Sequence, residues 1–368
     1  MADCPTWLEI NLSAIEHNTH QILQRTGVPI MAVVKADAYG YGAEKVARAA
    51  LSAGATWLAV ARFSEALALR QLGIMAPLLV FGMVTPPEAD AAIFHNVSLT
   101  LYSQEAAELY AARARALGKK ARVHLKVDTG MGRFGVLEED ALFLAKQALE
   151  LGGIEIEGIY SHFANIDSIP KDPLAPIQLR RFQVALESLR DAGIDPLWKH
   201  FSNSAAALGY PETRFNLVRV GAALLGIKPF YFEPFPDYLR RVVNWKAQLA
   251  SCRLLPPGWG ISYGHDYITQ RDEVIGVVPI GYGDGFRRHP TNEVLVDGLR
   301  VPVVGRVCVD LCMVRLTRLL PLGSEVIILG EQGHESIFIE NLASRWGTSQ
   351  AAVTTAIHQR VPRIYIRD

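Results

Sequence analysis

The sequence predicts an α/β protein built as an eight-stranded β/α (TIM-type) barrel with a C-terminal β-rich domain. Short apolar runs alternate with amphipathic or alanine-rich segments from about residue 30 to residue 220. An aromatic, proline-rich connector follows at 229–236, and strand-like runs without long helices continue beyond it. With 368 residues and 50% hydrophobic content, the chain can bury one large core and one smaller core.

The expected barrel strands are short and rich in β-branched residues. They cover 30–36, 56–61, 77–81, 97–101, 122–127, 156–160, 199–202 and 216–220. The main helical segments between them cover 44–51, 65–72, 104–117, 140–151 and 178–192. Eight strands with helical crossovers favour a barrel. A doubly wound open sheet is the alternative, but no strand-linked Gly-x-Gly-x-x-Gly turn opens a helix here.

The segment after the connector predicts a β domain. Its expected strands cover 242–250, 274–279, 293–296, 300–304, 313–316 and 325–329. Asp297-Gly298 lies between two of them and is a strong two-residue hairpin signal. The leading strand Thr6–Asn11 precedes a helix at 13–25 and can pair with this domain. We therefore expect a barrel at 11–230 and a second domain made of 1–10 and 231–368.

The charge and cysteine content narrow the function classes. Lys+Arg and Asp+Glu both number 37, so no basic field exists to attract nucleic acid or a membrane surface. The four cysteines show neither a disulfide framework nor zinc spacing, and we expect no metal site. The N-terminus lacks a signal peptide and no apolar run reaches membrane-spanning length, so we expect a cytoplasmic protein.

The run from Met31 to Gly42 carries one lysine, Lys35, at the end of a strand of alanine and valine. Burial disfavours the ammonium form, and a neutral amine suits Schiff-base chemistry. A lysine that extends its head to water is the ordinary alternative. The run closely resembles the pyridoxal-phosphate lysine segment of alanine racemases. The resemblance implies that Lys35 holds pyridoxal 5'-phosphate as a Schiff base and that Tyr39 reaches the phosphate.

A second run at a strand end, Lys126-Val-Asp-Thr-Gly-Met-Gly-Arg133, also matches alanine racemase. Strand alternation points Lys126 into the barrel. In the family this lysine is commonly carbamylated, and the resulting anion orients the arginine. By resemblance, Arg133 contacts the cofactor's phenolic oxygen and the substrate carboxylate. A lysine satisfied by a buried carboxylate is the alternative that spacing alone leaves open.

Three further residues at strand ends match family positions around the cofactor ring. By resemblance, His162 bonds the catalytic tyrosine of the partner subunit, and Arg219 faces the pyridine nitrogen. An arginine stays protonated, so it keeps that nitrogen unprotonated and makes the ring a weaker electron sink. His200 supports Arg219 from behind, again by resemblance.

The loops after the last two expected strands predict a phosphate site. Barrels of this type commonly bind phosphate there. The segment offers Asn203, the hydroxyl of Ser204 and the backbone N–H of Gly221. Such donors can neutralise a phosphate without a P-loop.

The C-terminal domain carries the second half of the resemblance. Ser-Tyr263-Gly matches the segment whose tyrosine is the opposing base, and racemisation needs a base on each face of a planar carbanion. Tyr282 matches the tyrosine that narrows the substrate entrance. Cys308-Val309-Asp310 matches the segment whose amide helps to hold the substrate carboxylate, with Val309 as the substrate-binding position. Family dimers are head-to-tail, so the resemblance implies a homodimer with shared active sites.

The resemblance implies a racemase that interconverts L-alanine and D-alanine with Lys35 and the partner's Tyr263, and that supplies D-alanine for peptidoglycan. A serine or broad-specificity racemase is the alternative, because Val309 replaces the usual methionine and Gln359 replaces a tyrosine of some members. The segment at 349–354 also lacks the usual Tyr-Glu pair. A non-catalytic pyridoxal-phosphate homeostasis protein ranks lower, because such proteins consist of a barrel alone. A decarboxylase is disfavoured by the missing Gly-Glu-Pro-Gly-Arg segment.

Overall fold

The computed structural model describes residues 4–167, 172–228 and 234–367, which fall into two compact units. The barrel unit comprises Ala14–Ala38 and Ala43–Arg240. The β unit comprises Met1–Ser13, Tyr39–Gly42 and Arg241–Asp368. The chain therefore leaves the barrel unit briefly after Ala38 and returns to it at Ala43. Residues 229–233 of the expected connector lie outside the described residues.

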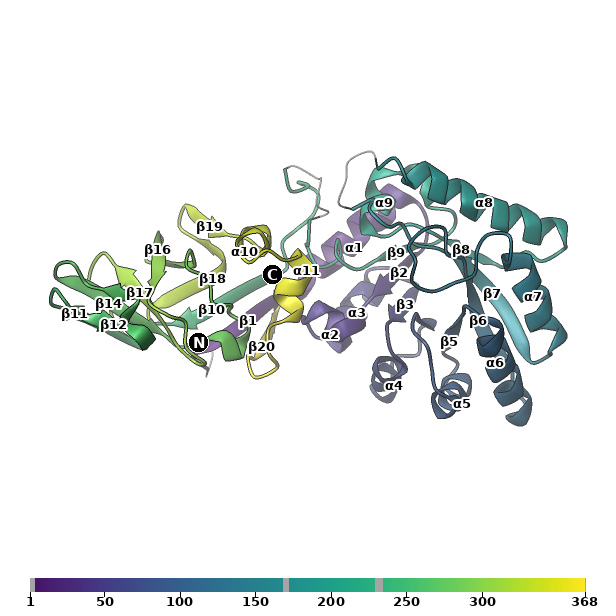
Figure 1. Cartoon of the computed structure of the whole chain (residues 1–368), viewed down its shortest axis with the longest axis horizontal. Coiled ribbons are helices and arrows are strands. Elements are labelled where there is room, and N and C mark those ends of the chain that lie inside the picture. The colour runs from purple at the N-terminus through teal and green to yellow at the C-terminus, as the bar shows by residue number, and fades with distance from the viewer. Residues whose placement is uncertain (1–3, 168–171, 229–233, 368) are drawn as a thin grey trace. The chain divides into compact units, whose positions relative to one another are not determined.

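The barrel unit confirms the predicted eight parallel strands (Figure 1). In sequence order they are β2 (Ile30–Val33), β3 (Trp57–Val60), β4 (Leu78–Val80), β5 (Ser98–Leu101), β6 (Ala121–Lys126), β7 (Ile154–Tyr160), β8 (Trp198–His200) and β9 (Val218–Val220). They pair in the order β8-β7-β6-β5-β4-β3-β2-β9. Backbone bonds from Asn216 to Lys199 (3.3 Å) and from Arg219 to Ser202 (3.1 Å) join the two outermost segments, so the barrel is nearly closed.

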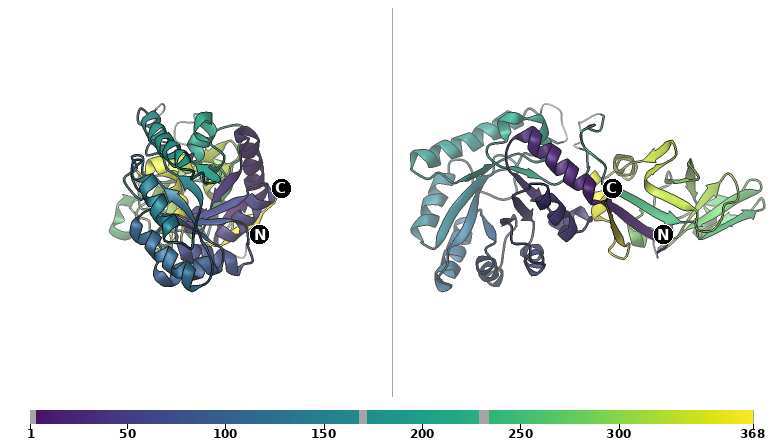
Figure 2. Two further views of the ribbon diagram at one scale, coloured as in Figure 1. Left: turned by 90° about the vertical axis from the view of Figure 1, so that its right-hand side faces the viewer. Right: turned by 180° about the vertical axis from the view of Figure 1, so that it is seen from behind.

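Helices cover the outer side of these strands, as Figure 1 and the two views in Figure 2 show. They are α1 (Leu12–Thr26), α3 (Ala43–Ser52), α4 (Phe63–Gln71), α5 (Pro86–Phe94), α6 (Gln104–Ala116), α7 (Ala141–Glu150) and α8 (Ala175–Asp191), with short α2 (Lys35–Tyr39) and α9 (Ser204–Gly209). Strands β2 to β5 are buried along their whole length, which explains their continuous apolar composition. No described helix is long and apolar enough to cross a membrane.

The β unit is built around a ten-stranded sheet and confirms the predicted β-rich domain. Its strands are β1 (Thr6–Asn11), β10 (Val243–Gln248), β11 (Ser251–Leu255), β14 (Glu273–Val278), β15 (Glu293–Val296), β16 (Leu299–Val304), β17 (Cys312–Leu316), β18 (Glu325–Gln332), β19 (Glu335–Ile337) and β20 (Arg363–Ile366). Strands β12 (Gly260–Ile261) and β13 (Tyr267–Ile268) form a separate pair, and helices α10 (Ile339–Arg345) and α11 (Gln350–Thr355) complete the unit.

Two local predictions for this unit are confirmed. Strand β1 pairs antiparallel with β10 and parallel with β20. The hairpin between β15 and β16 turns at Asp297 and Gly298, whose φ angles are 54° and 72°. Two consecutive positive φ angles are the signature of a type I′ turn, and Gly298 takes that conformation without a Cβ penalty.

Candidate active site

Lys35 opens an unusual turn at the end of strand β2. The residues that follow it, Ala36, Asp37, Ala38 and Tyr39, have φ angles of 52°, 53°, 51° and 57°, so α2 is left-handed. A non-glycine residue in this region costs about 1–2 kcal/mol, because its Cβ crowds the following carbonyl oxygen. Such strain persists only where surrounding contacts impose it, and it concentrates at functional sites.

The Lys35 amine lies in a strongly cationic environment. Burial lowers its pKa, and the charges of Arg133 and Arg219 lower it further. The Glu65 carboxylate acts in the opposite direction. A larger fraction of this amine is therefore neutral near pH 7 than in an exposed lysine, which suits Schiff-base and proton-transfer chemistry.

The end of β6 places a second lysine inside the barrel. Lys126 is 4% exposed, and its Nζ donates a 2.9 Å bond to the carbonyl of Val127. Burial lowers the pKa of Lys126 to about 7, and the charges of Arg219 and Arg133 contribute. Gly135 crosses directly over this residue, since a Cβ at that position would lie 2.9 Å from Lys126 Cγ.

The loop after β6 is organised by one carboxylate. Oδ1 of Asp128 accepts backbone N–H bonds from Gly130, Met131 and Gly132, and Oδ2 accepts one from Arg133 at 3.2 Å. The loop backbone is thereby fixed, while the Arg133 side chain is exposed. The charge of this guanidinium still affects the pKa values of both Lys35 and Lys126.

Arg219 on β9 is the most deeply held cation of the group, at 3% exposed. Its Nη1 donates to the carbonyl and Nδ1 of His200, at 2.9 and 3.0 Å. Its Nη2 donates to the carbonyls of Ser161 and Phe201, at 2.7 and 2.8 Å, and approaches His162 Nδ1 at 3.2 Å. Burial lowers the pKa of Arg219 to about 10, which leaves it protonated at neutral pH.

Behind Arg219, a row of side chains crosses the barrel interior. His200 Nε2 lies 2.8 Å from His124 Nδ1, and His124 Nε2 lies 3.4 Å from Glu157 Oε1. The last distance is a loose contact rather than a well-formed hydrogen bond. Burial and the Arg219 charge hold the pKa of His200 well below its ordinary value, so this ring is neutral. Since Arg219 can only donate, His200 accepts at Nδ1 and donates from Nε2 toward His124.

The predicted phosphate-binding loops meet at Ser204. Its Oγ accepts the backbone N–H groups of Gly221 and Ala223, each at 3.3 Å. Asn203 caps helix α9, because its Oδ1 accepts the N–H of Ala206 at 3.0 Å. The N–H of Gly221 therefore already donates to Ser204 within the chain.

The predicted residues of the β unit lie on three loops that bond to one another. Ser262, which precedes Tyr263, donates from Oγ to the carbonyl of Arg306 at 2.7 Å. The N–H of Tyr282 donates to the carbonyl of Cys308 at 3.0 Å. The N–H of Gly283 donates to the carbonyl of Val309 at 2.9 Å. These bonds fix the two tyrosine-bearing loops against the 306–311 loop.

Arg360 reinforces this arrangement with ion pairs to Asp310 and Asp284, each at 2.8 Å. The side chains of Tyr263, Tyr282 and Val309 are 67%, 45% and 44% exposed. The structure therefore presents all three on the surface of the β unit. Tyr39 also belongs to this unit by its contacts, although Lys35 belongs to the barrel unit.

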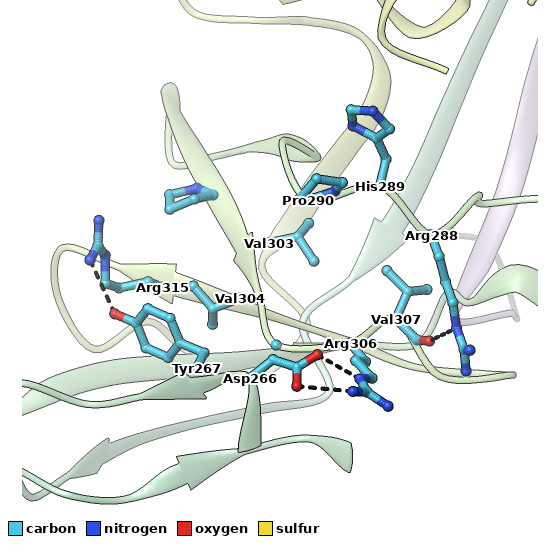
Figure 3. Close-up of a pocket in the computed structure, with 12 residues that line it drawn as sticks. Asp266, Tyr267, Arg288, His289, Pro290, Val303, Val304, Arg306, Val307 and Arg315 are labelled. Carbon is cyan, nitrogen blue, oxygen red and sulfur yellow. Dashed lines mark hydrogen bonds and ion pairs between the residues drawn. The ribbon is translucent and has the colours of Figure 1, made fainter. Parts of the chain in front are cut away.

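A pocket of about 510 Å³ opens in the β unit next to these loops (Figure 3). Its cations are largely engaged: Arg306 pairs with Asp266, and Arg315 donates to the hydroxyl of Tyr267 at 3.1 Å. Arg288 donates from Nε to the carbonyl of Val307 at 2.8 Å and lies over the Tyr282 ring. The pocket wall thus helps to position Tyr282.

Several residues that organise the site were not predicted from the sequence. Glu65 lies 30 residues after Lys35, and its only sequence signal is its place in the first turn of a helix. His124 and Glu157 point into the barrel from adjacent strands, and polar residues within otherwise apolar strands were the available signal. Arg360 precedes Val-Pro-Arg near the C-terminus, and no sequence pattern connects it to Asp310.

Comparisons with known proteins agree across the whole chain. Residues 10–229 match the family "Alanine racemase, N-terminal domain", and residues 242–365 match "Alanine racemase, C-terminal domain". The chain is 40% identical to the alanine racemase of Symbiobacterium thermophilum over 98% of this chain and 97% of that protein.

Solved structures give the same result. The alanine racemase of Bacillus anthracis with bound L-Ala-P superposes with a TM-score of 0.94 and is 38% identical in sequence. The match covers 100% of this chain and 96% of that chain. A histidine racemase from Leuconostoc mesenteroides superposes with a TM-score of 0.91 at 30% identity, with 100% of this chain and 99% of that chain covered.

Proposed function

The chain belongs to the alanine racemase family of pyridoxal-phosphate-dependent isomerases, and on this premise we propose that it interconverts L-alanine and D-alanine with Lys35 and the partner subunit's Tyr263 as the two bases. The main support for the proposal is a cluster of cations: half-buried Lys35, buried Lys126 and Arg219, and exposed Arg133. Neighbouring cations are unfavourable together unless an anionic ligand binds among them. The group therefore fits a phosphate-bearing cofactor and a substrate carboxylate.

The residues present fit pyridoxal phosphate in both charge and donor type. Lys35 supplies the amine that would hold it covalently. Ser204 and Gly221, at the loops where barrels of this kind bind phosphate, would hold its phosphate. The Arg219 guanidinium, which can only donate, would face the pyridine nitrogen. When bound, the cofactor withdraws electrons from the substrate and so acidifies the proton on Cα.

Lys35 acts on one face of the substrate. Its lowered pKa leaves a population of neutral amine that can accept the Cα proton of the D-isomer and return it. Arg219 stays protonated, so it would donate toward the ring nitrogen of the bound cofactor, which would limit the negative charge stored there and disfavour side reactions. His162 is neutral, because burial and the Arg219 charge hold its pKa well below the ordinary value, so it can orient a tyrosine hydroxyl.

Tyr263 acts on the opposite face and exchanges the Cα proton of the L-isomer. Its exposure within one chain is what a residue donated to a second subunit requires, so we propose a homodimer with shared active sites. Arg133 and the Val309 amide would hold the substrate carboxylate, and Tyr282 would narrow the entrance. The D-alanine formed would serve peptidoglycan synthesis.

The test is time-resolved chirality of each amino acid incubated with the purified protein and pyridoxal phosphate. Conversion of L-alanine toward an equal mixture of isomers supports the proposal, and Tyr263→Phe should abolish it while the cofactor absorbance is retained. Lys35→Ala should remove that absorbance. If wild type binds the cofactor and produces no D-alanine, the proposal is wrong.

L-Serine and L-histidine belong in the same assay. A structural neighbour is a histidine racemase, and Val309 replaces the methionine usual in the family. A methylene or two in a pocket wall discriminates by about 1–3 kcal/mol, so a broad-specificity racemase is the second candidate. Faster turnover of serine or histidine than of alanine would favour it.

A further inference from the structure

We propose that Glu65 is a positioning residue for Lys35: its carboxylate joins the start of helix α4 to the left-handed turn that follows the lysine and so holds the amine in place. The inference rests on the proposed function for its activity readout. Its structural readout is independent of that function.

The turn needs an external constraint. Ala36, Asp37, Ala38 and Tyr39 all have positive φ angles, and none of them is glycine. An L-residue released from its contacts returns to the right-handed or extended region. Because Lys35 immediately precedes these residues, any such relaxation would redirect its side chain.

Among the hydrogen bonds that the described residues make at this turn, three are considered first. The N–H of Ala38 donates to the carbonyl of Val34 at 2.9 Å, and Oδ1 of Asp37 accepts the N–H of Ala43 at 2.7 Å. The N–H of Ala36 donates to Oε1 of Glu65 at 2.5 Å. Of these three bonds, the Glu65 bond alone reaches the turn from a different strand–helix unit of the barrel. It is also made to the residue directly after Lys35.

Glu65 is itself well anchored. Its Oε2 accepts the N–H groups of Ala61 and Arg62, both at 2.9 Å, at the N-terminus of helix α4. One oxygen therefore caps the helix while the other holds the turn. The carboxylate also attracts the Lys35 ammonium, against the effects of burial and Arg133. It is the negative charge that balances this part of the cationic cluster.

The ordinary alternative is that Glu65 is only a helix cap, and the chain offers a matched control for that role. Glu88 occupies the equivalent third position of helix α5, where Oε2 accepts the N–H of Thr85 at 2.8 Å. Glu65 and Glu88 are both half-buried. A pure capping role predicts similar effects for Glu65→Gln and Glu88→Gln.

The experiment compares Glu65→Ala, Glu65→Gln and Glu88→Gln with wild type as full-length holoenzymes. We expect Glu65→Ala to lower kcat about 100-fold with KM changed less than threefold, while cofactor absorbance persists. Glu65→Gln keeps one acceptor oxygen but loses the charge. It should lose less activity than Glu65→Ala and move the ascending limb of the pH–rate profile to lower pH, because the Lys35 ammonium loses its nearby anion. Glu88→Gln should keep kcat within twofold of wild type.

Hydrogen–deuterium exchange of the Ala36 amide provides the second readout, measured with and without cofactor. Glu65→Ala should exchange this amide at least tenfold faster than wild type, whereas Glu88→Gln should leave it unchanged. Equal effects of the Glu65 and Glu88 variants on both readouts would overturn the proposal, as would unchanged exchange in Glu65→Ala. A wild-type protein that lacks racemase activity would refute the proposed function, and the exchange experiment would still decide whether Glu65 holds the turn.

Discussion

Removing the Lys126 amine should change the pH dependence of stability by a calculable amount. Burial lowers the pKa of this lysine from 10.5 to about 7. Each tenfold change in acidity corresponds to about 1.4 kcal/mol, so holding Lys126 charged in the folded protein costs about 5 kcal/mol. Lys126→Met keeps a long apolar side chain and removes that cost.

Whether stability rises or falls with pH depends on which state, folded or unfolded, binds the Lys126 proton more tightly. Between pH 7 and pH 10.5 the unfolded chain keeps the Lys126 proton while the folded protein releases it, so wild-type stability rises with pH across this window. Below pH 7 Lys126 is charged in both states, so the folded protein bears the full free-energy cost of the buried charge. We therefore expect Lys126→Met to be more stable than wild type at pH 7, and this advantage to shrink by about 3 kcal/mol at pH 9.5.

Urea unfolding of cofactor-free protein in CO₂-free buffer measures this difference. Lys45→Met, at an exposed lysine, is the control for replacing a lysine by methionine. A constant difference between Lys126→Met and wild type from pH 7 to pH 9.5 would refute the reasoning. Added ¹³C-bicarbonate should stabilise wild type alone and produce a carbamate signal that Lys126→Met lacks, because a neutral amine reacts with CO₂.

Three further substitutions test the site. Arg219→Ala should lower the free energy of unfolding by about 3–5 kcal/mol in a denaturant titration, because it leaves buried carbonyls without donors; a loss under 1 kcal/mol would contradict the bonding described. Ser204→Ala should weaken cofactor affinity about tenfold in a spectroscopic titration, roughly the worth of one hydrogen bond to a charged group, and unchanged affinity would exclude it from the phosphate site. Gly158→Ala should displace the His124 ring, since the new Cβ would lie 2.2 Å from Nδ1; histidine NMR shifts identical to wild type would show that the contact is absent.

The barrel could be predicted because parallel strands that are buried on both faces appear in the sequence as short apolar runs. The alternation of these runs with helical segments can be recognised even when the strand boundaries are wrong by one or two residues. Helix α5 was not predicted, since Pro86 and Pro87 suggest a loop. Proline suits the first helical turn, and Thr85 with Glu88 forms a capping box there.

The site could be predicted in part, because strand ends of a barrel converge and their polar residues stand out. Lys126 and Arg219 lie in one cluster as the topology requires. The left-handed turn after Lys35 was not predictable, because no residue in Ala-Asp-Ala-Tyr prefers positive φ strongly enough to indicate it. That conformation depends on contacts distant in sequence, and a single chain without its fold does not reveal them.

Strand β1 has a consequence for how the chain is made. Its partners are β10 and β20, so residues 6–11 pair with residues 243–247 and 363–366. A ribosome releases the whole barrel sequence before either partner exists, and the ladder between β1 and β20 can form only after residues 363–366 have been made. Until then β1 is an unprotected strand edge, the kind of surface through which nascent chains join one another. Barrel folding can proceed from the N-terminal side during synthesis, whereas the β unit must wait for residues 363–366.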